Sequence, residues 1–131
     1  MVVWRWVKGL LPRSVRVFVV MQPVSLRKSF DGLSNEVRHV LAQDPLNGHV
    51  FVFLNRRRNQ VKLLVWTRGG FTIFHKRLER GTFAFAKQID GDVNSIEFDV
   101  HELSMLLEGI DASSVRSSRR WEPARYLRQQ T

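Results

Sequence analysis

The chain has 131 residues, of which 44% are apolar and 11% aromatic, and it carries a formal net charge of +9 with no cysteine. This length and composition suit one domain with a buried core and exclude general disorder. The lack of cysteine excludes a disulfide framework and a thiolate metal site. The longest apolar run near the N-terminus, Val17–Met21, is too short for a membrane span or a signal sequence, so we expect a soluble, cytoplasmic protein with no membrane partner.

The charge is unevenly distributed along the chain. Residues 55–80 contain eight basic residues and one acid, a sum of +7, whereas residues 81–111 contain one basic residue and seven acids, a sum of −6. We expect an N-terminal extension at residues 1–11, because Pro12 interrupts whatever precedes it. Residues 12–111 would form an α+β domain, and residues 112–131, which mix serines with five arginines, would form a flexible basic tail.

The first half of the predicted domain holds a strand and a helix. Val15–Val20 is rich in β-branched and aromatic residues, which favours a strand. The helix that follows has Ser25 as its predicted N-cap, and Gly32 weakens its middle enough to permit a bend. Its end is predicted before Pro45. One apolar face follows from residues spaced three or four apart: Leu26, Phe30, Leu33, Val37 and Leu41.

Three strands are predicted next, at His49–Leu54, Gln60–Trp66 and Phe71–Lys76, and their short connections favour an antiparallel meander. We expect residue 54 to pair with residue 60 and residue 66 with residue 71. Because side chains alternate between the two faces of a strand, this pairing places a uniformly apolar set against the helix. That set is Phe51, Phe53, Val61, Leu63, Val65 and Phe74.

The C-terminal part of the domain is predicted to add strands and a second helix. Thr82–Ala86 resembles a further strand, and Ser95–Phe98 is a short one. Asp99 and Glu102 have the spacing of a capping box, which predicts a helix start, and Gly109 suits its end. The fold class is therefore α+β: an antiparallel sheet of four to six strands packed with a helix on each face. The apolar stripe of the second helix is Val100, Leu103, Leu106, Leu107 and Ile110.

The sequence gives little support to an enzyme. The predicted strands carry no acid except Glu97, whereas a nuclease or transposase of the two-metal type needs paired carboxylates. Asp90 and Asp92 flank a glycine, which is typical of a turn. The four histidines lack the spacing of a zinc site. We therefore predict no catalytic residue, no metal and no cofactor.

Basic and aromatic side chains share the second face of the predicted sheet. The expected pairing places Lys62 opposite His75 and Trp66 opposite Phe71, an arrangement that suits phosphates and unstacked bases. The alternative is that Trp66, Phe71 and Ile73 form a second core under the C-terminal helix, which would leave the cations at its rim.

Three consecutive arginines fill the predicted turn between the first two strands of the meander. Arginines crowded on a rigid turn repel one another, so a polyanion is the expected partner. The alternative is a solvated loop whose arginines only keep the hairpin soluble. We predict a nucleic-acid-binding surface that comprises Arg56, Arg57, Arg58, Lys62, Lys76, Arg77 and Arg80.

Four motifs in this order resemble the TnpB-type accessory protein, the product of the second open reading frame, of insertion sequences of the sixty-six class. The motifs are LRKSFDGL (Leu26–Leu33), DPLNGHVFVFLNRRRNQVKLLVW (Asp44–Trp66), GFTIFHKRLERGTFAF (Gly70–Phe85) and LSMLLEGID (Leu103–Asp111). The resemblance implies a bacterial mobile-element protein that acts beside a separate transposase, which carries the catalytic acids. Departures from the family pattern occur at Leu26, Ser29, His75 and Phe85–Ala86.

Composition and resemblance together predict a non-catalytic accessory protein for DNA transposition of an insertion sequence. Its expected partners are DNA, bound through the basic hairpin, and the transposase of the same element. Phosphate contacts carry little sequence information, so we expect weak specificity. The alternative is a protein–protein adaptor that docks the transposase without binding DNA itself. The oligomeric state is not predicted.

Overall fold

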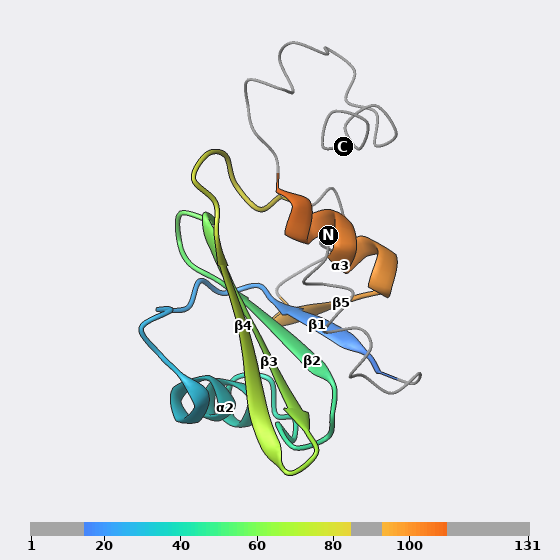
Figure 1. Cartoon of the computed structure of the whole chain (residues 1–131). Coiled ribbons are helices and arrows are strands. Elements are labelled where there is room, and N and C mark those ends of the chain that lie inside the picture. Colours follow the sequence, from blue (N-terminus) through green and yellow to red (C-terminus); the bar gives the residue numbers. More distant parts are fainter. Residues whose placement is uncertain (1–14, 85–92, 110–131) are drawn as a thin grey trace.

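A five-stranded sheet with a helix on each face forms the part of the chain that the structure describes, residues 15–84 and 93–109 (Figure 1). This is a computed structural model. Neither helix in these ranges is long and apolar enough to cross a membrane. The elements in chain order are β1 (Val17–Val20), α2 (Phe30–His39), β2 (Val50–Leu54), β3 (Gln60–Thr67), β4 (Gly70–Arg77), β5 (Ser95–Phe98) and α3 (Val100–Glu108).

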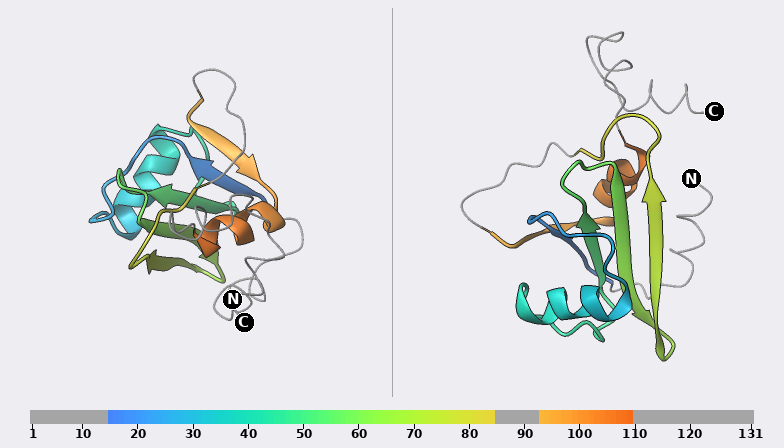
Figure 2. Two further views of the ribbon diagram at one scale, coloured as in Figure 1. Left: turned by 90° about the horizontal axis from the view of Figure 1, so that it is seen from above. Right: turned by 90° about the vertical axis from the view of Figure 1, so that its left-hand side faces the viewer.

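The strands lie in the order β4-β3-β2-β1-β5, a succession that can be followed in the left view of Figure 2. The predicted α+β class is confirmed, and β2, β3 and β4 form the expected antiparallel meander. The sheet as a whole is mixed, because β1 runs parallel to β2. This parallel pair follows from the connection: α2 returns the chain to the end of the sheet where β1 began. Antiparallel β5 then covers the other side of β1.

The register between β2 and β3 differs from the predicted one by a single residue. Leu54 pairs with Val61 instead of Gln60, so the connection Asn55–Gln60 is one residue longer than predicted. Side chains alternate along a strand, and a shift of one residue therefore exchanges the two faces. The assignment of one set of residues to the α2 face was wrong, because they face α3: Val61, Leu63, Val65 and Phe74.

Two separate cores result, one on each face of the sheet. On the α2 face, Phe51 and Phe53 are fully buried against Leu33 and Val37, as predicted for these two phenylalanines. On the α3 face, three leucines of the helix cover the second apolar set. Those leucines are Leu103, Leu106 and Leu107, which are at most 1% exposed.

Helix α2 begins later than the sequence predicted, and Ser25 is not its N-cap. The amide of Val24 donates to the carbonyl of Leu54 at 3.0 Å, which holds the preceding segment against the end of β2. The carbonyl of Lys28 accepts from the Lys62 ammonium at 2.8 Å. Regular helix starts after these two contacts, with Ser29 at the N-cap and no side-chain cap bond.

Gly32 allows a close approach rather than a bend. Helix α2 continues through it without interruption. A Cβ atom at this position would lie 2.9 Å from the Cβ of Lys28. The glycine therefore lets the Lys28 side chain lie along the helix, where its ammonium pairs with Glu36.

The start of α3 confirms the predicted capping box. The Asp99 carboxylate accepts from the amide of Glu102, and the Glu102 carboxylate accepts from the amide of Asp99. Gly109 ends the helix with φ 79°, and a Cβ there would meet Leu78 at 2.8 Å. In the predicted strand Thr82–Ala86, only Thr82 forms an isolated bridge among the described residues. Phe83 and Ala84 form no strand, and Phe85 and Ala86, the Asp90–Asp92 loop and both predicted terminal segments (1–11 and 112–131) fall outside the described ranges.

Candidate nucleic-acid interface

The three consecutive arginines project from a turn, Asn55–Gln60, that is held by its own asparagine side chains; we call it the arginine turn. Asn55 Oδ1 accepts from the amides of Asn59 and Gln60 at 3.1 and 3.0 Å, and its Nδ2 donates to Asn59 Oδ1 at 2.7 Å. Arg58 takes the left-handed conformation with φ 57°, which is unusual for a side chain of this size. The turn is therefore structurally fixed while its arginines are exposed.

A second segment fastens the arginine turn from the outside. The amide of Leu78 donates to the carbonyl of Asn59 at 2.8 Å, and the amide of Phe83 donates to the carbonyl of Arg58 at 2.7 Å. The Phe83 ring is fully buried in the core under α3. This anchoring reduces the entropy that the turn would lose on binding a ligand.

A pocket of about 530 Å³ lies beside the arginine turn, between it and the segment that precedes α2. Three arginines line it: Arg56 and Arg57 from the turn, and Arg27 from across the pocket. Sequence reasoning missed Arg27, because it is isolated from the basic cluster by more than one element. We call this cavity the arginine pocket, and its complete lining is Pro23, Val24, Ser25, Leu26, Arg27, Asn55, Arg56, Arg57 and Gln60.

The charges of the arginine pocket are not neutralised within the described ranges. No ion pair joins Arg27, Arg56 or Arg57 to an acid of residues 15–84 or 93–109. Two acids nearby in sequence are paired with other cations, Glu36 with Lys28 and Glu79 with Arg77. Three guanidinium groups around one concavity without a carboxylate form a site suited to an anion, and phosphate is the anion whose geometry they match best.

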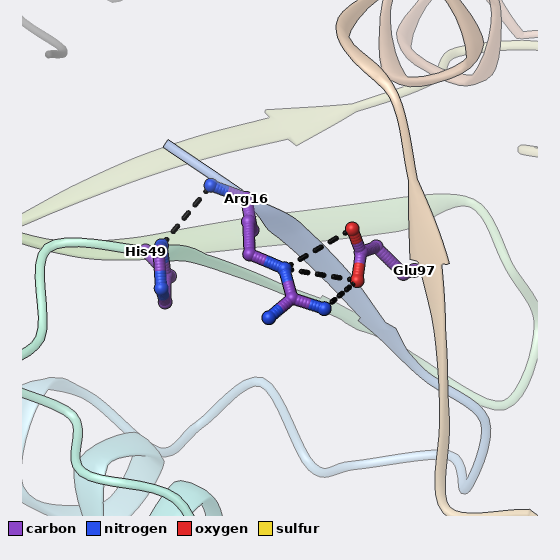
Figure 3. Close-up of polar contacts among 3 residues, drawn as sticks. All are labelled: Arg16, His49 and Glu97. Atoms are coloured by element: carbon purple, nitrogen blue, oxygen red, sulfur yellow. Dashed lines mark hydrogen bonds and ion pairs between the residues drawn. The ribbon is translucent and has the colours of Figure 1, made fainter. Parts of the chain in front are cut away.

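Arg16, at the opposite end of the sheet, differs from the pocket arginines because it is paired with a carboxylate, that of Glu97 (Figure 3). Its Nε donates to the two Glu97 oxygens at 3.0 and 3.2 Å, and its guanidinium lies 5.2 Å from the centre of the Phe18 ring. The hydrogen bonds and the negative charge of Glu97 raise the pKa of Arg16 above its ordinary value. The backbone amide of Arg16 donates to His49 Nδ1 at 3.0 Å, which fixes the end of β1 beside β2. This arginine is structural.

Lys62 is directed inward, contrary to its expected place at an exposed rim. Its side chain is only 9% exposed, and its ammonium donates to the Lys28 carbonyl beneath the start of α2. The predicted position opposite His75 is confirmed. Because it is nearly buried, the Lys62 ammonium adds positive charge beneath the surface and is less accessible to a ligand than the arginines of the turn.

Lys76 lies on the other face of the sheet, beside α3. Its ammonium donates to the carbonyl of Leu107 at 2.7 Å, one of the last carbonyls of that helix. Burial lowers the pKa of Lys76, and the nearby charge of Glu108 partly opposes this. A cation at a helix C-terminus also interacts favourably with the helix dipole. Lys76 therefore stabilises α3 and does not share a surface with the arginine pocket.

Arg77 and Arg80 do lie at the same end of the sheet as the arginine turn. Arg77 is paired in register with Gln60, which lines the pocket, and its guanidinium binds Glu79 at 3.1 Å. Both members of that ion pair are well exposed, so the pair leaves Arg77 able to exchange partners. Arg80 is exposed on the segment that fastens the turn.

His75 lies between two of these cations and is sensitive to them. Its Nε2 is 3.0 Å from Gln60 Oε1, across from Lys62. Partial burial lowers the pKa of His75, and the positive charges of Lys62 and Arg77 lower it further. The imidazole therefore favours its neutral form near pH 7.

The aromatic pair expected on this face is present but lies away from the pocket. Trp66 and Phe71 meet edge to face with their ring centres 4.9 Å apart, next to the two-residue turn between β3 and β4. Phe71 and Ile73 pack on the α2 core. The alternative that Phe71 and Ile73 are core residues is therefore confirmed, but the helix that covers them is α2 and not the C-terminal helix. Neither aromatic ring lines the arginine pocket.

No group of three or more histidine, aspartate or glutamate side chains within residues 15–84 and 93–109 is arranged to hold a metal ion. The only strand-borne acid expected from the sequence, Glu97, is bound by Arg16. Asp90 and Asp92 lie outside these ranges.

Comparison with known proteins places this arrangement in a family. Two proteins of Sinorhizobium fredii, each described as uncharacterized, are similar to the chain. The protein y4jC is 33% identical over 104 residues, which cover 79% of this chain and 86% of y4jC. The protein y4hO is 33% identical over 114 residues, which cover 86% of this chain and 94% of y4hO. No solved structure matches. Residues 15–117 match the family described as "IS66 Orf2 like protein". This range includes both helices, the whole sheet and every residue of the arginine pocket. The resemblance drawn from the four motifs is confirmed, and the chain belongs to the IS66 Orf2-like family.

Proposed function

We propose that this protein is a non-catalytic accessory protein for transposition of an insertion sequence, and that it binds DNA through the arginines at the arginine-turn end of its sheet. Family membership supports the accessory role in transposition. The observation that carries DNA binding is the arginine pocket, where Arg27, Arg56 and Arg57 share one concavity without an acidic neighbour in its lining.

The physical argument rests on charge that is held in place. Guanidinium groups bind phosphate oxygens through two parallel hydrogen bonds, and a fixed turn lowers the ordering cost of forming them. Arg58, Arg77 and Arg80 would extend the surface from the rim. Such contacts supply affinity and position but little sequence choice, so sequence specificity would come from the transposase or from the DNA structure.

The non-catalytic part of the proposal follows from where the acids are used. Cleavage or strand transfer by two metal ions needs carboxylates that converge on the ions. In the described ranges, the Glu97 carboxylate is held by Arg16, and Asp99 and Glu102 cap α3. The purified protein with Mg²⁺ or Mn²⁺ should therefore neither nick nor join DNA. Cleavage that disappears on replacing Asp90 or Asp92 would contradict this.

The test is a pull-down with DNA of the element ends and with the transposase, separately and together. The wild-type protein should retain DNA in the absence of transposase. The triple variant Arg27→Gln/Arg56→Gln/Arg57→Gln should bind DNA about tenfold or more weakly at moderate salt. The control variant Lys76→Met also loses a positive charge, but from an ammonium group on the α3 face that does not line the pocket, and it should bind within about twofold of wild type.

Two results would contradict DNA binding. One is a wild-type protein that retains no DNA even at low salt. The other is a triple variant that binds as wild type does. If the transposase is nevertheless retained without DNA, the protein–protein adaptor replaces the proposal.

A further inference from the structure

We propose that the arginine pocket receives one unpaired nucleotide of a DNA strand, with its phosphate on the arginines and its base inside the pocket. This inference rests on the proposed DNA binding and adds which form of DNA the site takes. It starts from the shape of the site, because a surface that only follows a duplex backbone needs no recess.

The recess is large enough for more than a phosphate ion. Its volume of about 530 Å³ lies within the range of small-ligand sites. The arginines occupy two sides of it, Arg27 on one segment and the arginine turn on the other. A phosphate bound between them leaves the remaining space next to the wall formed by Pro23, Val24 and Leu26.

That wall and the polar groups beside it suit a base. Apolar side chains and arginine planes both pack on the face of an unpaired base. Gln60 lines the pocket, and its Oε1 lies 3.0 Å from His75 Nε2. Amide and hydroxyl groups, here Gln60 and Ser25, are the side chains that hydrogen-bond to the edges of unpaired bases.

A duplex cannot use this combination. Its phosphates lie on a convex surface and its bases are paired inside, so a base enters a pocket only after unstacking, which is unfavourable. Duplex DNA would therefore place phosphates on the guanidinium groups of Arg27, Arg56 and Arg57 and leave the space beside them unfilled. Single-stranded DNA, a frayed end or an unpaired overhang can fill it without that cost.

The test compares two single strands of equal length and equal charge. One is oligothymidylate, and the other is an abasic oligonucleotide with the same number of phosphates. We measure the affinity of the full chain for each by fluorescence anisotropy at fixed salt. Oligothymidylate should bind about tenfold more tightly than the abasic strand, because base contacts are worth this much per stacked base.

A variant that narrows the pocket without changing its charge makes the test specific. Ser25 is exposed and lines the pocket, and its backbone carbonyl accepts from the Lys28 amide at 3.2 Å, a bond that does not involve the side chain. Ser25→Leu should abolish the preference for oligothymidylate while leaving affinity for a blunt duplex within about twofold. Ser29→Leu is the matched control, since Ser29 is exposed, makes no side-chain cap bond and lies outside the pocket. It should keep the preference.

Equal affinity for the two strands would overturn this inference, and so would a Ser25→Leu variant that keeps the preference. In either case duplex binding that depends on the arginines would leave the proposed function standing. No binding to any of the three DNAs at low salt would overturn both.

Discussion

Replacing Asn55 by alanine tests whether DNA binding depends on how the arginines are held in place, because their charge stays the same. The substitution removes three side-chain hydrogen bonds of the arginine turn but none of its arginines. Each such bond contributes about 0.5–1.5 kcal/mol net, and water can replace part of it at this half-buried site. We therefore expect the free energy of unfolding to fall by about 1–3 kcal/mol in urea melts.

The consequence for binding follows from the loosened turn. DNA must now order the backbone of residues that were fixed before, at a cost on the order of 1 kcal/mol for each residue. Asn55→Ala should weaken DNA binding by about three- to tenfold, while the dependence of affinity on salt stays unchanged because every charge remains. Binding as tight as wild type, or a shallower salt dependence, would refute the reasoning.

Asn47→Ala is the matched control for this experiment. The Asn47 side chain also accepts a backbone amide in a turn, that of His49 at 2.8 Å, but it precedes β2 and so lies at the other end of that strand. It should lower stability to a similar or smaller extent and leave DNA affinity as in wild type.

Four further outcomes follow from the packing and the charges. Phe53→Ala should lower the free energy of unfolding by about 3–5 kcal/mol, because the ring is fully buried in the α2 core; a loss under about 1 kcal/mol in urea melts would mean that the face assignment is wrong. Lys76→Met should destabilise the protein by about 1–2 kcal/mol through loss of the bond to the Leu107 carbonyl, and unchanged thermal and urea stability would contradict that contact. The lowered pKa of His75 means that the unfolded chain binds its proton first, so stability should be independent of this group above its ordinary pKa of about 6.5 and fall as pH decreases below it. Lys62→Met should raise the pKa of His75 in an NMR titration, and a pKa that stays the same or falls would show that the charge of Lys62 does not act on the imidazole.

The strands, the start of α3 and the turn between β3 and β4 could be predicted from local sequence patterns. Alternating β-branched and aromatic residues identified the strands, and the Asp99–Glu102 spacing identified the start of α3 because a capping box is complete within four residues. The two-residue turn between β3 and β4 could likewise be predicted from the short connection between the two strands. Its central residues, Arg68 and Gly69, both have positive φ, as such turns require.

The register of β2 and β3 could not be predicted in the same way. It depends on Arg58 in the left-handed conformation, which sequence rules reserve for glycine and asparagine. That single residue lengthens the turn and exchanges the faces of β3. The start of α2 was missed because the segment before it is held by residues distant in sequence, through the bonds from the Val24 amide to the Leu54 carbonyl and from Lys62 to the Lys28 carbonyl.

The candidate site could be predicted from sequence only in part. Consecutive arginines in a turn are visible as a cluster, but Arg27 joins them only because the Val24 amide binds the end of β2. Lys62 and Lys76 looked like exposed strand cations. Their inward bonds to carbonyls of α3 and of the segment before α2 are tertiary contacts that no spacing rule contains.

The salt dependence of duplex binding tests the central claim most directly. We compare the wild-type protein, the triple variant Arg27→Gln/Arg56→Gln/Arg57→Gln and the control Lys76→Met, plotting the logarithm of affinity against the logarithm of salt concentration. If the arginines neutralise phosphates, the slope of the triple variant should be shallower than that of wild type by about two to three units, and the control slope should equal that of wild type. A triple variant with the wild-type slope and affinity, or a wild-type protein whose binding does not respond to salt, would contradict the account.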